Sequence, residues 1–214
     1  MTPPQIRPYQ PSDEETLRRI CCDTALYGQP IDPLFSDRRL VGDYLLGYYT
    51  RFEPESIFVA EMDGRIVGYL TGCEDTRRFE RLFARRLAPK LLLGFMKRGH
   101  WLRARIWRLF YAIIQSERRW ANLQHSAAAP YPAHCHVNLD PGFRQAGTGS
   151  ALLTAFLNHL CVHRISGIHI VTGTDAGKAF FAKSGFNLLA KHPSPKLPGL
   201  LEQPEVWVMG KAVV

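Results

Sequence analysis

The chain has 214 residues, 46% of them hydrophobic and 21% charged, and its 27 basic and 19 acidic side chains give a formal net charge of +8. These values are typical of a globular chain and argue against wholesale disorder, and the length suits one domain. The apolar runs are far shorter than the roughly 20 residues that span a bilayer, and the N-terminus lacks the apolar stretch of a secretory signal, so we expect a cytoplasmic protein.

The first third of the chain predicts a strand and two helices. A short strand is predicted over residues 6–9. The helix after it is expected to begin at Ser12, a capping residue type, with Glu15 at the capping-box position three residues later. A second helix is predicted over 36–50, and Pro54 lies in the segment that ends it.

Residues 57–72 carry the clearest local signal in the chain, that of a β-hairpin. Apolar runs over 57–61 and 66–72 flank Asp63-Gly64, and this dipeptide favours the tight turn of a hairpin. We therefore expect two adjacent antiparallel strands in this part of the chain.

Residues 76–124 form a long basic stretch with apolar residues at three- and four-residue spacing. Thirteen of the 27 basic residues, but only two acidic ones, lie between Arg77 and Arg119. The spacing predicts two amphipathic helices with a break marked by Gly94 and Gly99. We interpret the stretch as a helical insertion that packs on the domain; peripheral membrane contact and a docking surface for acidic partners are the alternatives. Its aromatic residues suit burial better than base stacking, so no nucleic acid partner is expected.

The remainder of the chain alternates strands and helices. Strands are predicted over 132–139, 167–172 and 205–209, and helices over 149–163 and 176–184. Helices placed between strands imply an α/β sheet with at least one parallel pairing.

The segment after residue 137 carries the most chemical information. A predicted strand ends at Asp140, a loop containing Gly147 and Gly149 follows, and an apolar-periodic helix then begins. The free N–H groups of a first helical turn, at the positive end of the helix dipole, bind phosphate oxygens. Arg144 is placed to add a charge-assisted contact.

Three kinds of phosphate-binding loop compete for this segment. A Walker loop requires Gly-Lys followed by Ser or Thr, which is missing here. A dinucleotide-binding loop requires a third glycine, and Leu152 occupies that position. The third kind, R-x-x-G-x-G, which holds the pyrophosphate of coenzyme A, fits at every position.

The acyl-CoA-binding motif of the GCN5-related N-acetyltransferase (GNAT) superfamily resembles the run Val137-Asn-Leu-Asp-Pro-Gly-Phe-Arg144-Gln-Ala-Gly147-Thr-Gly149. The order of the other predicted elements is similar as well, and residues 177–186 resemble the family's A-x-x-F-Y-x-x-x-G-F segment. The resemblance covers nearly the whole chain except the basic stretch. It implies an α/β GNAT fold over 1–214, with a mixed central sheet, splayed parallel strands, flanking helices and a helical insertion at 76–124.

A closer resemblance is to the acetyltransferase-like domain attached to O-GlcNAc hydrolases and to its free-standing microbial relatives. The segments that carry this second resemblance are Asp32-Pro-Leu-Phe35, Glu53-Pro-Glu-Ser-Ile-Phe-Val-Ala60, Gly68-Tyr-Leu-Thr-Gly72 and Gly167-Ile-His169.

The family resemblance implies acetyl-CoA as cosubstrate, no metal, and direct attack of an amine on the thioester without an acyl-enzyme. Catalysis of this kind needs a base for the ammonium proton, an N–H group that polarises the thioester carbonyl, and in some cases an acid for the thiolate. The positions that the resemblance assigns to cofactor binding are Leu139, Asp140, Arg144, Gln145, Ala146, Gly147, Thr148, Gly149, Ser150, Thr174 and Phe181.

Two positions depart from the family pattern. The family tyrosine that often serves as the thiolate acid is Phe181 here, and the family asparagine before the same helix is Thr174. These differences bear on catalysis more than on binding, because phosphate and pantetheine recognition rest mostly on backbone groups. A non-catalytic acetyl-CoA-binding module, used for interaction or sensing, is therefore the alternative to an acetyltransferase.

The catalytic candidates are His169, His136 and Asp75. His169 lies on the second splayed strand, where some family members carry a catalytic Glu, although a purely structural histidine is the competing interpretation. His134 and His136 share a strand face by alternation, but no third metal ligand is visible at a suitable spacing. Glu74 and Asp75 leave the hairpin near the splay and are candidates for binding an acceptor ammonium.

The acceptor is expected to be a small-molecule or peptide amine. The sequence does not choose among the amines that the superfamily modifies, since a fold by itself does not select a substrate. A homodimer is left open.

Overall fold

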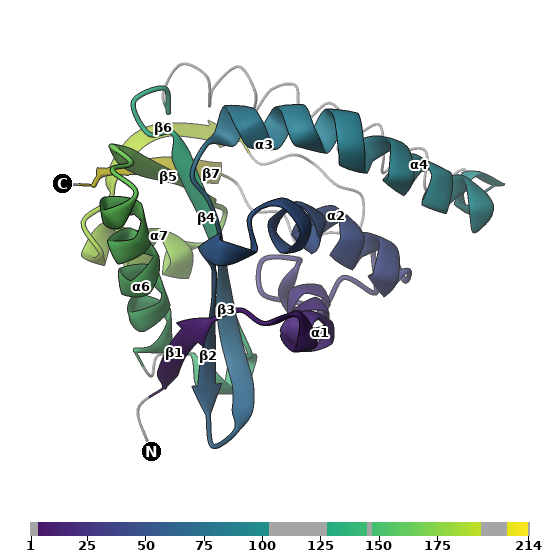
Figure 1. Ribbon diagram of the computed structural model, residues 1–214, viewed down its shortest axis with the longest axis horizontal. Coiled ribbons are helices and arrows are strands. Elements are labelled where there is room, and N and C mark those ends of the chain that lie inside the picture. The colour runs from purple at the N-terminus through teal and green to yellow at the C-terminus, as the bar shows by residue number, and fades with distance from the viewer. Residues whose placement is uncertain (1–3, 103–127, 145–146, 194–204, 214) are drawn as a thin grey trace.

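The computed structural model describes residues 4–102, 128–144, 147–193 and 205–213. Within these residues seven strands form one mixed sheet in the order β1-β2-β3-β4-β5-β7-β6 (Figure 1). The strands are β1 (Gln5–Pro8), β2 (Ile57–Met62), β3 (Arg65–Cys73), β4 (Ala133–Leu139), β5 (Gly167–Thr172), β6 (Asn187–Pro193) and β7 (Glu205–Ala212).

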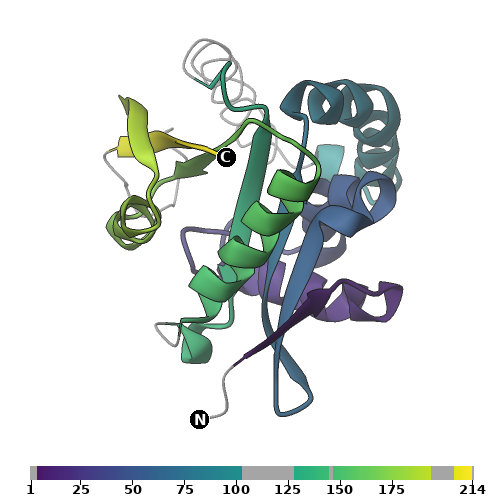
Figure 2. The same cartoon turned by 60° about the vertical axis from the view of Figure 1, so that its left-hand side comes forward.

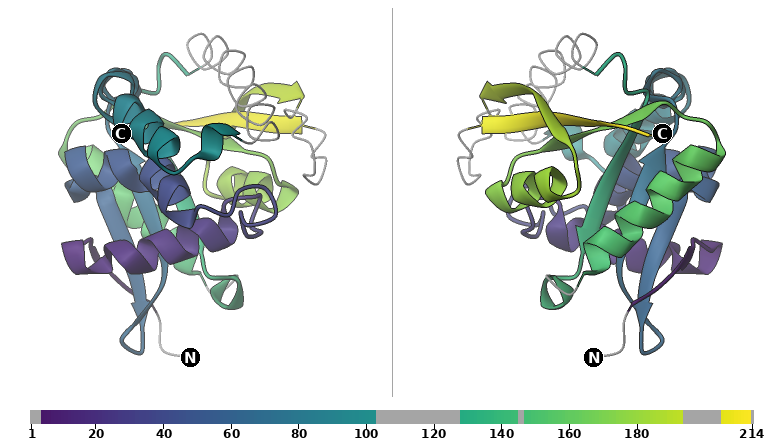
Figure 3. Two further views of the ribbon diagram at one scale, coloured as in Figure 1. Left: turned by 90° about the vertical axis from the view of Figure 1, so that its right-hand side faces the viewer. Right: turned by 90° about the vertical axis from the view of Figure 1, so that its left-hand side faces the viewer.

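Helices cover both faces of this sheet. One face carries α1, α2 and the α3–α4 arm, and the other carries α6 and α7, as the two views of Figure 3 show. A π-helical turn, Phe83–Leu87, joins α3 to α4. The helices are α1 (Glu14–Thr24), α2 (Arg38–Phe52), α3 (Thr76–Leu82), α4 (Ala88–Lys97), α6 (Thr148–Val162) and α7 (Asp175–Lys183).

Each face of the sheet has its own apolar core. Alternate residues of a strand point to opposite faces, so the neighbours Tyr69 and Leu70 on β3 enter different cores. Leu70 packs with Phe156 of α6, whereas Tyr69 packs with Leu17 of α1 and Leu46 of α2. Burial on both sides explains why β3 is apolar along most of its length.

The pairing between β4 and β5 is short and positions the site. These parallel strands pair only at Ala133 with Ile168 and at His134 with His169. By contrast, β4 pairs with β3 at six positions, and β5 pairs with β7 at six. Beyond His134 and His169 the two strands therefore diverge toward their carboxyl ends (Figure 2), which confirms the predicted splay.

Most predicted elements are present with small shifts of their ends. The hairpin is confirmed, and both Asp63 and Gly64 adopt the positive φ angles that a tight hairpin turn requires. The predicted cap at Ser12 is wrong, because a 3-10 turn precedes α1 and the Asp13 carboxylate accepts the Gln10 N–H instead. The strand β6 was not predicted, since its exposed edge position leaves no apolar alternation to detect.

The basic stretch is helical in its described part. Leu87 and Phe95 are buried against the α2 side of the molecule, so the described part of this stretch packs on the rest of the protein. The predicted break at Gly94 is wrong, because Gly94 lies inside α4; the helix ends before Gly99, which has a φ of +70°. Residues 103–124 of the predicted insertion lie outside the described residues. None of the described helices has the length and apolar character needed to cross a bilayer.

Candidate functional site

The glycine loop lies between β4 and α6, at the end where β4 and β5 are furthest apart. After β4 a 3-10 turn, Pro141–Phe143, is held by the Asp140 carboxylate, which accepts the Gly142 N–H at 3.4 Å. Gly147 then adopts a left-handed φ of +77° at the N-cap of α6, a conformation that costs little only for glycine. The helix that begins here is 15 residues long, so its first turn presents free N–H groups and a positive dipole end.

Thr148 gives this loop a further polar group. The residue is only 1% exposed, and its hydroxyl oxygen has no hydrogen-bond partner among the described residues. A buried hydroxyl without a partner costs roughly 1–3 kcal/mol, so such a group is expected where a bound ligand completes the hydrogen bonding. Ser150, two residues later, is exposed at the same helix end.

The charged residues of the loop have partners within the protein. Arg144 donates a hydrogen bond of 3.2 Å to the Gly28 carbonyl, which ties the loop to the connection between α1 and α2. A guanidinium has five N–H donors, so this bond leaves it able to contact a phosphate as well. The Asp140 carboxylate lies 3.8 Å from Arg19 and 3.6 Å from Arg65, so its predicted role in cofactor binding can come only from its backbone. Gln145 and Ala146 lie outside the described residues.

Three histidines gather where β4 and β5 separate. The rings of His134 and His169, the last paired residues, have centroids 5.9 Å apart. His136, two residues further along β4, has its ring 5.8 Å from that of His134. All three lie on the sheet face covered by α1, α2 and α3, where Tyr49 and Phe79 pack against His134.

His134 is held on both ring nitrogens. The Thr76 hydroxyl donates its single proton to the Pro132 carbonyl at 2.8 Å, so it accepts from His134 Nδ1 at 2.8 Å. The Nε2 atom must then accept from the Tyr49 hydroxyl at 2.9 Å. Burial holds the pKa of His134 well below its usual range, and the repulsion from His136 and His169 adds to this shift. His134 is therefore a neutral, structural histidine.

His169 keeps one nitrogen available for chemistry. Its Nδ1 lies 2.7 Å from the Tyr131 carbonyl oxygen, which can only accept, so Nδ1 carries the proton and Nε2 the lone pair. The residue is 3% exposed, and burial lowers the pKa of its imidazole below 6.5. Near neutral pH the ring is therefore uncharged and already in the tautomer of a general base.

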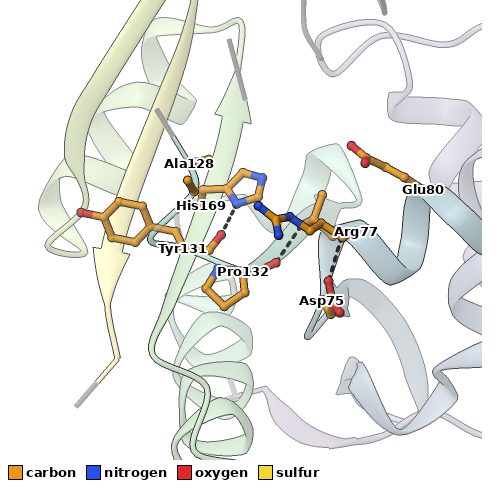
Figure 4. Close-up of a pocket in the computed structure, with 9 residues that line it drawn as sticks. Asp75, Arg77, Glu80, Ala128, Tyr131, Pro132 and His169 are labelled. Atoms are coloured by element: carbon orange, nitrogen blue, oxygen red, sulfur yellow. Dashed lines mark hydrogen bonds between the residues drawn. The ribbon is translucent and has the colours of Figure 1, made fainter. Parts of the chain in front are cut away.

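His169 also lines a pocket of about 290 Å³ (Figure 4). In that view the Arg77 side chain points toward His169, and Glu80 lies beyond it on α3. Asp75 is at the rim, where its Oδ1 accepts the N–H groups of Arg77 and Arg78 and caps α3. The residues that line the pocket are Asp75, Thr76, Arg77, Glu80, Ala128, Ala129, Tyr131, Pro132 and His169.

Comparison with known proteins identifies the fold. No protein-family model matches the chain. Among solved structures it is similar to SsHAT, with 26% identity over 100% of both chains and a TM-score of 0.75. It is also similar to the polyamine N-acetyltransferase of Drosophila melanogaster (12% identity, 98% of this chain and 99% of that chain, TM-score 0.61). A third match is a GNAT superfamily phosphinothricin acetyltransferase from Sinorhizobium meliloti in complex with acetyl-CoA (14% identity, 99% and 89% covered, TM-score 0.57).

The chain has the fold of the GNAT acetyltransferases. Within this GNAT fold, the splay of β4 and β5 and the glycine loop after β4 are the two features that the sequence motif predicted.

Of the two departures from the GNAT sequence pattern, Thr174 immediately precedes α7 and Phe181 lies within it. The Thr174 hydroxyl accepts the Gly177 N–H at 3.0 Å and so caps α7. Phe181 is 8% exposed, and its ring packs 4.9 Å from Phe180 and 5.2 Å from Phe186 in the core between the sheet and α6. In the position where GNAT members often carry a tyrosine, this chain therefore has a buried ring with no proton to give.

The predicted catalytic residues of this GNAT fold are brought together only in part. His169 and Asp75 line the same pocket. His136 is exposed and does not line that pocket. The pKa of its imidazole is lowered, because the surrounding protein displaces water from part of the ring and because His169 repels a positive charge there. Glu74 does not line the pocket either, because its carboxylate contacts the α6 residues His159 and His163.

Some groups that shape the site had no sequence signal. Tyr131 acts through its backbone carbonyl, which every residue type possesses. Thr76 and Tyr49 come from helices distant in sequence from β4, so only the folded chain shows that they hold His134.

Proposed function

We propose that this protein is an acyl-CoA-dependent N-acetyltransferase that transfers the acetyl group of acetyl-CoA to an amine by direct attack. The observation that carries the proposal is the short pairing of β4 with β5, which is limited to two residue pairs. Beyond His169 the two strands separate, and the gap between them leads to the free N–H groups at the start of α6. The GNAT fold supports it, and so does acetyl-CoA bound to the Sinorhizobium meliloti relative.

The loop residues fit the diphosphate of the cosubstrate. The N–H groups of Thr148, Gly149 and Ser150 face the end of α6, and beside them lies the Thr148 hydroxyl, for which the described part of the chain offers no partner. Arg144 adds a positive charge on the α1–α2 side of the loop. Backbone groups of Leu139 and Asp140, at the free edge of β4, would pair with the pantetheine arm. Bound acetyl-CoA supplies an activated thioester, which the splay would orient.

His169 is the residue that we assign as general base. Its Nε2 would take the proton of the acceptor ammonium, while the Tyr131 carbonyl holds Nδ1–H and fixes the plane of the ring. Because burial disfavours the charged ring, His169 stays available as a base below its usual pKa of about 6.5. His136 is the second candidate base. It is exposed to solvent and lies on the face of β4 that also carries His134.

Asp75 and Glu80 suit the recognition of the acceptor. Their carboxylates line the pocket around His169 and would attract an ammonium group, and Arg77 beside them suits an acceptor that also carries a negative charge. A pocket of about 290 Å³ admits a small amine or one terminal residue of a peptide. We therefore propose a small-molecule or peptide amine as acceptor.

The alternative function is a non-catalytic acetyl-CoA-binding module. Phe181 is the observation that favours it, because a buried phenylalanine cannot protonate the leaving thiolate. In an active enzyme the proton for the thiolate would have to come from water or from another side chain, or the thiolate would leave without an enzyme acid.

Two measurements on the full chain separate these functions. Calorimetry with acetyl-CoA tests binding, and release of free coenzyme A thiol with a panel of amines tests turnover. Binding together with amine-dependent thiol release is the result that we expect. Binding without turnover for any amine supports the module, and absence of binding overturns both proposals.

We also propose kinship with the acetyltransferase-like domains of O-GlcNAc hydrolases, on the sequence segments that resemble them. The segment from Asp32 to Phe35 has a structural role in this chain, since Asp32 accepts two hydrogen bonds from Arg38 at the start of α2. The four buried cysteines, Cys21, Cys22, Cys73 and Cys135, are free thiols, which suits the reducing cytoplasm that we propose as location.

A further inference from the structure

A cluster of two histidines and one carboxylate lies outside the site described above. His159 and His163 are four residues apart at the C-terminal end of α6 and so lie on one face of it. Glu74, the residue after β3, reaches between them. Its Oε1 is 2.8 Å from His159 Nε2 and 2.5 Å from His163 Nδ1, and the two rings are 4.2 Å apart.

A buried network holds the carboxylate arm of this cluster in place. Glu53, which is 1% exposed, accepts the Glu74 backbone N–H at 2.7 Å and the Tyr48 hydroxyl at 2.7 Å. The Ser56 hydroxyl lies 3.3 Å from Glu53 and 3.2 Å from His159 Nε2. The Glu53 bond fixes the backbone that carries the Glu74 carboxylate, whereas Ser56 contacts the same Nε2 atom of His159 that would bind an ion and would have to release it.

The three groups match the ligand preferences of zinc. The three ligand atoms all lie within 4.8 Å of one another. Two imidazoles and a carboxylate bind Zn²⁺ in many proteins, with the fourth position taken by water, and two histidines at i and i+4 supply ligands from one helix face. Ligands at about 2.0–2.2 Å from a tetrahedral ion lie about 3.4 Å apart, so the two distances from the Glu74 carboxylate to the histidine nitrogens need to lengthen by less than about 1 Å. His163 is 42% exposed, which gives an ion a path to the cluster.

We propose that Glu74, His159 and His163 form a Zn²⁺ site, in which the bound ion links the end of β3 to the last turn of α6. The next residue, Asp75, caps α3 and lines the pocket around His169, so a bound ion would also fix the rim of that pocket. The competing interpretation is a histidine–carboxylate ion pair, stabilised by the negative end of the α6 dipole.

The test is zinc binding to the metal-free, untagged full chain, in competition with a chromophoric chelator. We expect one Zn²⁺ per chain and a higher melting temperature in its presence. His159→Ala and His163→Ala should each weaken binding by at least about a hundredfold, as losing a direct ligand costs more than losing a supporting group.

Two control variants and one spectrum complete the experiment. His192→Ala removes a histidine of the strand β6, which lies outside the cluster. Cys161→Ser removes the exposed thiol of α6, the helix that carries His159. Both should bind zinc as the original chain does, and Co²⁺ bound to the original chain should show visible bands without a thiolate charge-transfer band.

The proposal is overturned if zinc does not bind at micromolar concentration, if Cys161→Ser abolishes binding, or if the two alanine variants bind unchanged. A lower melting temperature for His163→Ala, with no effect of zinc on the original chain, would establish the ion pair instead. Because no measurement here uses acetyl-CoA, failure of the zinc site and failure of the acetyltransferase proposal remain separate results.

Discussion

Replacing His169 with asparagine separates a catalytic role of this residue from a structural one. The asparagine amide N–H occupies the position of Nδ1, which lies 2.7 Å from the Tyr131 carbonyl oxygen, so it can still donate to that carbonyl, but asparagine cannot take up a proton. If the Tyr131 hydrogen bond is kept, the free energy of unfolding should change by no more than about 1 kcal/mol. General base catalysis contributes roughly 10²–10⁴-fold, so we expect kcat to fall by about a hundredfold or more.

The assay is thiol release at saturating acetyl-CoA across about pH 5.5–8.5, with acetyl-CoA binding measured separately by calorimetry. In the original enzyme, activity should rise with pH through the His169 pKa, which burial places below 6.5, because only the neutral ring accepts a proton. His169→Asn should lose this acidic limb while binding acetyl-CoA unchanged. His192→Asn, on the edge strand β6, is the matched control and should leave kcat unaltered. If His169→Asn keeps activity within a few-fold of the original with the same pH profile, the assignment of His169 is refuted, and His136 becomes the candidate base to test.

Three further predictions follow from the same geometry. Gly147→Ala forces a side chain into a left-handed conformation at a cost of roughly 1–2 kcal/mol, so the acetyl-CoA Kd should rise about tenfold, whereas Gly142→Ala in the same loop should not change it. Asp75→Asn keeps a side chain able to cap α3 but removes the negative charge beside the pocket. Calorimetry should therefore find acetyl-CoA binding unchanged, and thiol-release kinetics should give a higher KM for a cationic acceptor. An unchanged KM would exclude Asp75 from acceptor binding. The pKa values of His134 and His169 are lowered by burial in the folded chain, so below about pH 6.5 the unfolded chain binds more protons and the free energy of unfolding in urea should decrease toward pH 5; a flat profile would contradict this.

The parts of the fold that were predicted from sequence are those whose signal is local. Asp63-Gly64 needs only its own turn geometry to specify the hairpin, and the glycine loop needs only fixed spacing along one segment. Prediction failed where elements compete or lie exposed. Ser12 does not cap α1 because it lies inside a 3-10 turn, and the Asp13 carboxylate at the end of that turn points back to the Gln10 N–H and to Arg7 of the first strand.

The candidate site was predicted only where its residues follow the strands that form it. His169 could be placed from its strand, but the tautomer that makes its Nε2 a proton acceptor depends on a carbonyl from Tyr131, 38 residues away. The cluster of Glu74 with His159 depends on two segments 85 residues apart, and no spacing in the sequence indicates that pairing. Long-range contacts of this kind become visible only once the order of the strands is known.

The two-pair ladder between β4 and β5 divides the hydrogen-bonded sheet into two panels, β1–β4 and β5–β7, each with long ladders of its own. Along the facing edges past His134 and His169, alternate backbone amides have no ladder partner within the described residues. Amide hydrogen exchange should therefore be slow inside each panel and fast along this seam. A ligand that lies in the seam and bonds to its edges would act as an additional strand, and its arrival should appear as protection confined to those amides.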